Sequence, residues 1–162
     1  MNPDALNWRV GAVGGVVGAM GYSTFIEVVN VAANGMRAFF VPFRQIGAVV
    51  LGPHALQESF DLLTAVAAGT AVHLTIAAIF GIALARIISQ LSVRTLSAYF
   101  TLGLLAGLLF YVVNVVAIFP AAFPWFLDNS RLTQSIGHAI FGGITAAWMA
   151  RGRLRADRAH SA

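Results

Sequence analysis

Four polar side chains that could do chemistry lie inside long apolar stretches of this sequence. They are Glu27, His73, Asn114 and His138, one in each of four stretches. A carboxylate in hydrocarbon costs at least ~2.5–3.5 kcal/mol on insertion scales, so polar groups inside a membrane seek one another. If the four stretches are transmembrane helices, we predict that these side chains gather in one cluster.

Three interpretations of such a cluster stay open at this point. In the first, the residues form hydrogen bonds between helices and fix their packing, at ~0.6 kcal/mol for each bond on average. In the second, Glu27, His73 and His138 bind a metal ion or a haem b, because imidazole and carboxylate are suitable ligands. In the third, Glu27 and a histidine carry protons or a small solute.

The composition indicates that lipid is the solvent of this chain. Of its 162 residues, 59% are hydrophobic and 10% are charged, against about 25% charged in soluble domains. Cysteine is absent, which excludes disulfides and cysteine-based metal sites. The net charge of +4 comes from arginines near the expected membrane boundaries, and it indicates orientation beside anionic lipid, with no nucleic-acid partner.

Four apolar stretches are long enough to cross a bilayer, and they predict an all-α fold, a transmembrane four-helix bundle. At ~1.5 Å per residue, each covers the hydrocarbon thickness. We expect the bundle to form a single domain over residues 1–150, followed by a basic cytoplasmic tail at 151–162. The spans are expected at about residues 10–33, 62–88, 96–119 and 132–150.

Two connections between the spans have the composition of a membrane interface. The apolar run at about residues 43–52 is too short to cross, and it predicts an interfacial helix whose Arg44 reaches the headgroups. A loop packed on the bundle is the alternative. The second connection, FPAAFPWF, predicts an interfacial corner with Trp125 and Phe126 as anchors. Glu58 and Asp61, just before the second span, are expected to cap that helix.

Glycines at steps of three and four predict close helix packing, within the chain or between copies. In the first span they lie opposite Glu27, so neither face of that helix suits lipid. Three partners in a small bundle cannot easily cover both faces, which favours association with another chain. The packing glycines are Gly11, Gly15 and Gly18 in the first span and Gly103 and Gly107 in the third.

The arginines predict the orientation of the spans. Four spans place both termini on one side of the membrane, and the positive-inside rule assigns that side to the cytoplasm. On this side lie seven arginines: Arg9, Arg86, Arg94, Arg151, Arg153, Arg155 and Arg158. On the other side lie three: Arg37, Arg44 and Arg131.

Short sequence echoes suggest two tandem helical hairpins. VVNVA at 28–32 returns approximately as VVNVVA at 112–117, in the first and third spans. AIFG at 78–81 returns at 139–142, in the second and fourth spans. Such a pattern is typical of repeats related by an axis along the membrane normal.

Several segments together resemble a group of small bacterial four-span membrane proteins. They are VPFRQIGAVVLGP before the second span, FDLLTAVAAGTAVHL entering it, FYVVNVVAIFPAAFPWF ending the third and GHAIFGG in the fourth. The resemblance implies a bacterial inner (plasma) membrane and no particular activity. Its pattern points to His73, Asn114, Pro124, Trp125, Phe126 and His138.

From these observations we expect a non-catalytic integral membrane protein. No Ser-His-Asp set, phosphate loop or dinucleotide fingerprint is present. The expected role is a structural or accessory subunit, or a homo-oligomer, without a cofactor, whose partners are the bilayer and other membrane subunits or further copies. The alternatives are a metal- or haem-binding protein that uses Glu27, His73 and His138, and a small proton or solute transporter.

Overall fold

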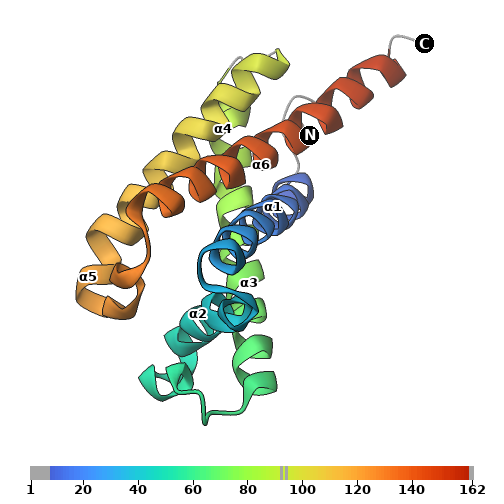
Figure 1. The fold of residues 1–162 in the computed structure, drawn as a ribbon. Helices are drawn as coiled ribbons and strands as arrows, with labels where there is room; N and C mark the ends of the chain where they lie inside the picture. The colour runs from blue at the N-terminus through green and yellow to red at the C-terminus, as the bar shows by residue number, and fades with distance from the viewer. Residues whose placement is uncertain (1–7, 92, 94, 161–162) are drawn as a thin grey trace.

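The chain is all-α over the residues that the structure describes. The computed structural model describes residues 8–91, 93 and 95–160, with only the backbone given for 154–160, and this part contains no strand (Figure 1). In order, the elements are α1 (Trp8–Asn34), η1 (Met36–Phe40), α2 (Val41–Leu51), η2 (Pro53–Leu56), α3 (Leu62–Gln90), α4 (Leu96–Tyr111), the π-helical η3 (Val112–Ile118), α5 (Phe119–Ala122), η4 (Pro124–Asp128) and α6 (Arg131–His160).

Three helical stretches in the described residues are long and apolar enough to cross a membrane. They are α1, α3 and the continuous stretch Leu96–Ala122, which joins α4, η3 and α5. Their length and composition indicate a membrane protein. The fourth predicted span lies in α6, which is not among the three, because Thr133, Gln134 and His138 lower the apolar content of its first half.

The long helices form two hairpins whose inner members pack together. Helix α1 lies between α3 and α6, and α6 lies between α1 and α4 (Figure 1). Where α3 leads into α4, Ile88, Tyr99 and Met149 share one buried cluster from α3, α4 and α6. Over their whole length, α3 and α4 make few contacts with each other. The two hairpins are therefore joined mainly through α1 and α6.

Glycine crossings hold each hairpin together. A Cβ atom built on Gly11 would lie 2.7 Å from the carbonyl oxygen of Gly81 in α3, and one on Gly15 would meet the carbonyl of Ala77. In the second hairpin, Gly103 and Gly107 meet α6 at Gly142 and His138 in the same way. Only glycine permits backbones to approach this closely, so these predicted packing glycines act within the chain.

The glycine face and Glu27 of α1 are both buried within this chain, although three neighbours were not expected to cover both easily. Gly11 and Gly15 face α3, whereas Gly18 faces α6, where its Cβ would lie 2.7 Å from the Phe141 carbonyl oxygen. Glu27 is only 9% exposed. The prediction counted partners around an idealised bundle, while in the structure two neighbours, α3 and α6, approach the glycine side from different directions.

The two AIFG segments occupy equivalent positions, since each places its glycine, Gly81 or Gly142, at a hairpin crossing. The VVNV echo does not. Aligning the crossings pairs Tyr22 with Asn114, whereas the echo pairs Asn30 with Asn114, about two turns away. The structure therefore supports two similar hairpins through their glycines, and the VVNV echo carries no structural equivalence.

Proline explains the π-helical segment η3. Pro120 has no N–H, and its ring would clash with the carbonyl of Val116 four residues earlier, so an α-helical ladder cannot continue unchanged. The backbone widens instead, and the Phe119 N–H bonds to the Asn114 carbonyl five residues back. The Asn114 amide also donates to the Phe110 carbonyl oxygen at 3.0 Å.

The connecting segments match the predictions in part. Helix α2 covers the predicted run and packs on α3, where Gly47 lies against the Ala65 carbonyl. Of the two predicted capping residues, Asp61 caps α3, since its carboxylate accepts from the Thr64 N–H at 2.7 Å, and Glu58 lies three residues earlier in the loop. At the C-terminus, α6 continues to His160, through the segment predicted as a separate tail, because its Arg, Leu and Ala residues are good helix formers.

Candidate functional site

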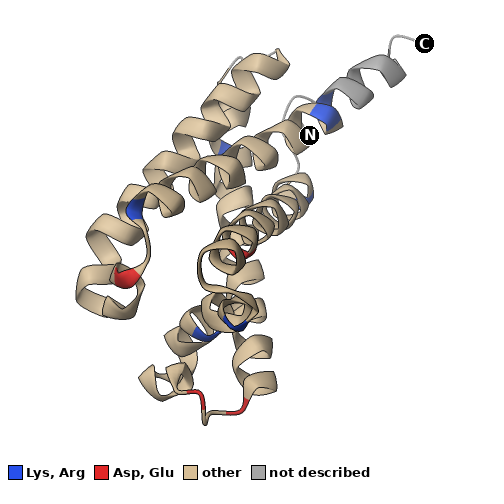
Figure 2. Ribbon diagram, in the orientation of Figure 1, with Lys and Arg blue, Asp and Glu red and all other residues tan. Residues whose placement is uncertain are grey.

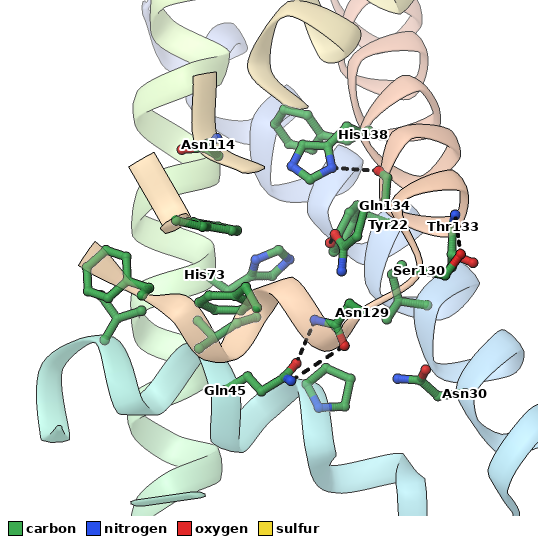
Figure 3. A pocket seen from close by; sticks show the side chains of 18 of the residues that line it. Tyr22, Asn30, Gln45, His73, Asn114, Asn129, Ser130, Thr133, Gln134 and His138 are labelled. Carbon is green, nitrogen blue, oxygen red and sulfur yellow. Dashed lines mark hydrogen bonds between the residues drawn. The ribbon is translucent and has the colours of Figure 1, made fainter. Parts of the chain in front are cut away.

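A pocket of about 500 Å³ lies at the end of the molecule where α2 and η4 meet (Figure 3). Residues of α1, α2, α3, α4, η3, α5, η4 and α6 line it. Ligand sites in proteins typically measure ~300–1,000 Å³ and combine apolar walls with a few polar groups. This pocket fits that description, since Phe110, Phe119 and Phe141 line it beside several amides and imidazoles.

The structure brings three of the four predicted polar residues to this pocket. His73, Asn114 and His138 all line it, from α3, η3 and α6 (Figure 3). Glu27 is not among the lining residues. It is buried, and its Oε2 atom has no hydrogen-bond partner among the described residues. His73, Asn114 and His138 therefore share one pocket, and Glu27 lies outside it.

Tyr22 connects the two imidazoles. Its ring centroid lies 5.6 Å from that of His73 and 5.1 Å from that of His138. Its hydroxyl donates to Gln134 Oε1 at 2.6 Å. Sequence reasoning missed both Tyr22 and Gln134 as site residues. Gln134 lies one helical turn before His138 on the same face, which is a signal that could have found it.

Hydrogen bonding determines which nitrogen of His138 carries the proton. Nδ1 lies 2.7 Å from the Gln134 carbonyl oxygen, and a carbonyl only accepts, so Nδ1 is the donor. In the neutral imidazole, Nε2 is then an acceptor. His73 is held differently, with its Nε2 3.2 Å from the Ser23 hydroxyl. The pocket therefore contains an imidazole acceptor on α6.

A set of amide hydrogen bonds joins α2 to η4 at the rim of the pocket. Asn129 Nδ2 donates to Gln45 Oε1 at 3.0 Å, and the Trp125 indole N–H donates to the Gln45 carbonyl at 3.0 Å. Gln45 Nε2 donates in return to the Trp125 carbonyl at 3.3 Å. We call Gln45, Trp125 and Asn129 the amide clasp. It connects the two hairpins across the pocket (Figure 3).

The three predicted interface anchors have partners inside the chain. Trp125 belongs to the amide clasp, and Phe126 is 8% exposed and stacks on Phe119 at 4.3 Å. Phe126 is therefore a core residue of the corner. The Arg44 guanidinium donates to the carbonyl oxygens of Gln57, at 2.9 Å, and of Ala55 and Phe60. It thereby satisfies backbone acceptors in the loop before α3.

Metal binding and nucleophilic catalysis find little support in this geometry. No group of three His, Cys, Asp or Glu side chains that could hold a metal ion occurs among the described residues. His73 and His138 supply two imidazoles to the pocket, and Glu27 lies outside it. The Ser23–His73 pair also differs from a catalytic pair, because Ser23 does not line the pocket and no described carboxylate bonds to His73.

Comparison with known proteins found no matching family model, no matching curated protein and no matching solved structure. The resemblance to small bacterial four-span membrane proteins therefore stays a prediction. The case for a function depends on the pocket.

Proposed function

We propose that this chain is a four-span membrane protein with α6 as its fourth span. Helix α6 has 30 residues, more than the ~20 that a crossing needs. Its polar side chains Gln134, His138 and Thr145 are buried, while Leu132 and Ile136 are exposed. A helix with its polar groups inside the protein and apolar groups outside suits lipid, even when its average hydropathy is modest.

The proposed orientation places both termini in the cytoplasm of a bacterial cell and the pocket toward the outer side of its inner membrane. The arginine distribution supports it. In the described residues, charged side chains are few along α1, α3 and α4, and Glu27 is the one inside the apolar part of α1 (Figure 2). Helix α2 would then lie in the outer interface, where its exposed residues Val41 and Val50 contact lipid.

We infer that the function is non-catalytic binding of a small molecule in the pocket. The observation that carries this inference is that Gln134 and His138 are each 8% exposed and yet direct polar groups into a cavity of about 500 Å³. Groups placed to fix packing alone would be expected to bond one another and leave no such space. A cavity with polar groups at membrane depth is a functional-site hypothesis by default.

Fewer observations support the other candidate functions. The accessory-subunit or homo-oligomer role was motivated by a first helix with too few partners, and α3 and α6 cover that helix. The transporter role needs Glu27 on the path of the solute, and Glu27 does not line the pocket. Binding of a metal ion or haem b would use the two imidazoles without a carboxylate.

Native mass spectrometry of the protein, purified from its own membranes in lipid nanodiscs, tests the proposed binding. We expect one retained small molecule per chain. Thr133→Trp, which fills the pocket from a half-buried position, should abolish it. Val116→Trp, at an exposed position of η3 that does not line the pocket, should retain it. No adduct, or the same adduct in both variants, would contradict the proposal.

A further inference from the structure

Resting on the proposed binding function, we propose that the ligand is an uncharged lipid-soluble alcohol that enters from the bilayer and places its hydroxyl group between Gln134 and His138. This assigns a ligand class and two recognition residues to the pocket. Four features of the described residues carry it: the charge of the lining, the free hydrogen-bonding atoms, the shape of the opening and the apolar walls.

The lining of the pocket excludes a charged headgroup. Asp128 is the only acid among the lining residues, it is exposed, and no arginine lines the pocket. A phosphate or carboxylate at the buried end would therefore have no counter-charge. Because an unpaired charge in an apolar environment is very costly, the occupant is neutral.

Between them, Gln134 and His138 offer the pocket one free donor and one free acceptor. Gln134 Oε1 is occupied by the Tyr22 hydroxyl, which leaves the Gln134 Nε2 hydrogens without a partner among the described residues. His138 Nδ1 is occupied by the Gln134 carbonyl, which leaves Nε2 as a free acceptor. A hydroxyl group both donates and accepts, so it can satisfy both atoms. A ketone, an ester or an ether can only accept.

The pocket opens sideways between α3 and η3. Ile76 of α3 and Ile118 of η3 both line the pocket and are each 41% exposed. Both belong to membrane-capable stretches, so this opening faces lipid and suits the apolar tail of a membrane-dissolved molecule. On the other side of the pocket, the amide clasp links α2 to η4. We place the entry at this apolar edge, with the tail left in the opening, because the other exposed lining residues include the polar Asn34, Asp128 and Ser130.

Three photoactivatable probes with the same diazirine-bearing sixteen-carbon chain test this proposal: the primary alcohol, its methyl ether and the carboxylic acid. The whole protein in nanodiscs is labelled, and labelled residues are mapped by mass spectrometry. We expect pocket labelling by the alcohol at about a fivefold lower concentration than by the ether, which loses one hydrogen bond. The acid at neutral pH should need at least about tenfold more than the alcohol.

Matched variants identify the recognising atoms. Gln134→Met keeps the shape of the side chain and removes the donor. The alcohol should then need an about fivefold higher concentration to label the pocket. His138→Phe removes the acceptor and should make alcohol and ether equal. Thr133→Val, on the pocket wall one residue from Gln134, should leave the preference unchanged.

The outcomes of the labelling experiment distinguish a failure of this proposal from a failure of the proposed binding function on which it rests. Equal labelling by alcohol and ether in the unmodified protein, or preference for the acid, would overturn the alcohol while leaving a binding pocket. Absence of pocket labelling by all three probes would overturn both. If His138→Phe fails to fold, Gln134→Met alone decides. Alcohol and ether both accept from Gln134, so both should need about fivefold more probe in that variant, and labelling by the alcohol at an unchanged concentration contradicts the assigned donor.

Discussion

The two hairpins cross in the same way but place different residues beside the crossing. In the first, Gly15 lies against the carbonyl of Ala77, and His73 lies one turn before that alanine. In the second, Gly107 lies against the carbonyl of His138, and Gln134 lies one turn before it. The residue whose carbonyl makes this contact is therefore an alanine in the first hairpin and a histidine in the second.

This difference separates packing from binding. Glycine crossings need only small residues and close backbones, and both hairpins meet that need. The donor and acceptor that we assign to ligand binding, Gln134 and His138, are both on the second hairpin, and the first contributes Tyr22 to orient the Gln134 amide. Variants at equivalent positions should consequently have equal effects on stability and unequal effects on binding.

The largest effect is expected for alanine at the crossings. Gly15→Ala and Gly107→Ala would each place a methyl group on a backbone carbonyl, and such overpacking costs ~1–3 kcal/mol. Equilibrium unfolding in mixed micelles measures the loss. Gly107→Ala should also reduce labelling by the alcohol, because it displaces His138. Gly152→Ala is the control, since its methyl group would lie 3.4 Å from Val10 Cγ1, an ordinary contact. Full stability in Gly107→Ala would show that the crossing is looser than described.

Tyr22→Phe tests the contribution of the first hairpin to the site. It removes the 2.6 Å hydrogen bond to Gln134, and a typical net value for such a bond is ~1 kcal/mol. Because the Gln134 amide is then free to rotate, its donor is no longer held toward the ligand, and alcohol and ether should both label the pocket more weakly. Labelling by the alcohol at an unchanged concentration would show that Gln134 is oriented by something else.

Variants of the amide clasp test how the hairpins are joined at the rim of the pocket. Gln45→Ala, Asn129→Ala and the double variant form a cycle, and the coupling should be ~0.5–1.5 kcal/mol, because two amide hydrogen bonds connect the pair. Unfolding in micelles again gives the values. Strict additivity of the two single variants would mean that the clasp does not link the hairpins.

Glu27→Gln should change little. The Glu27 Oε2 atom has no hydrogen-bond partner among the described residues, and the residue does not line the pocket. A neutral isostere therefore loses no bond, and we expect a stability change within about 0.5 kcal/mol and unchanged labelling. A loss of labelling would place Glu27 in the binding function and revive the cluster of four.

Asp61→Asn should have the smallest effect. Hydrogen bonds from Thr64 hold the pKa of the Asp61 carboxyl below its ordinary value. A lowered pKa means that this cap stabilises the fold above about pH 4 and that the benefit is lost as the pH falls through the folded-state pKa. Because the carboxyl is fully exposed, solvent screens it. The measurement is unfolding at pH 7 and pH 3, where the small difference from the unmodified protein should disappear at the lower pH.

Much of the helical fold could be predicted from the sequence, and less of the site. The lengths of the apolar stretches predicted α1 and α3, and the prolines predicted the corner after the third span. The meeting of His73 with His138 followed from the cost of polar groups in lipid. Glu27 is an exception to the rule that polar groups in a membrane meet one another. Burial removes this side chain from lipid, and its Oε2 atom still has no hydrogen-bond partner among the described residues. The role of Tyr22 depends on the angle between two hairpins, which no local pattern encodes.

The most direct test of the account compares two tryptophans in η3. Ile118 lines the lateral opening, and Val116, in the same segment, does not, although both are exposed to the surroundings. Labelling of pocket residues by the photoactivatable alcohol should be lost in Ile118→Trp and kept in Val116→Trp. Equal labelling in the two variants would contradict a bilayer-facing pocket, and with it the proposed route of the ligand.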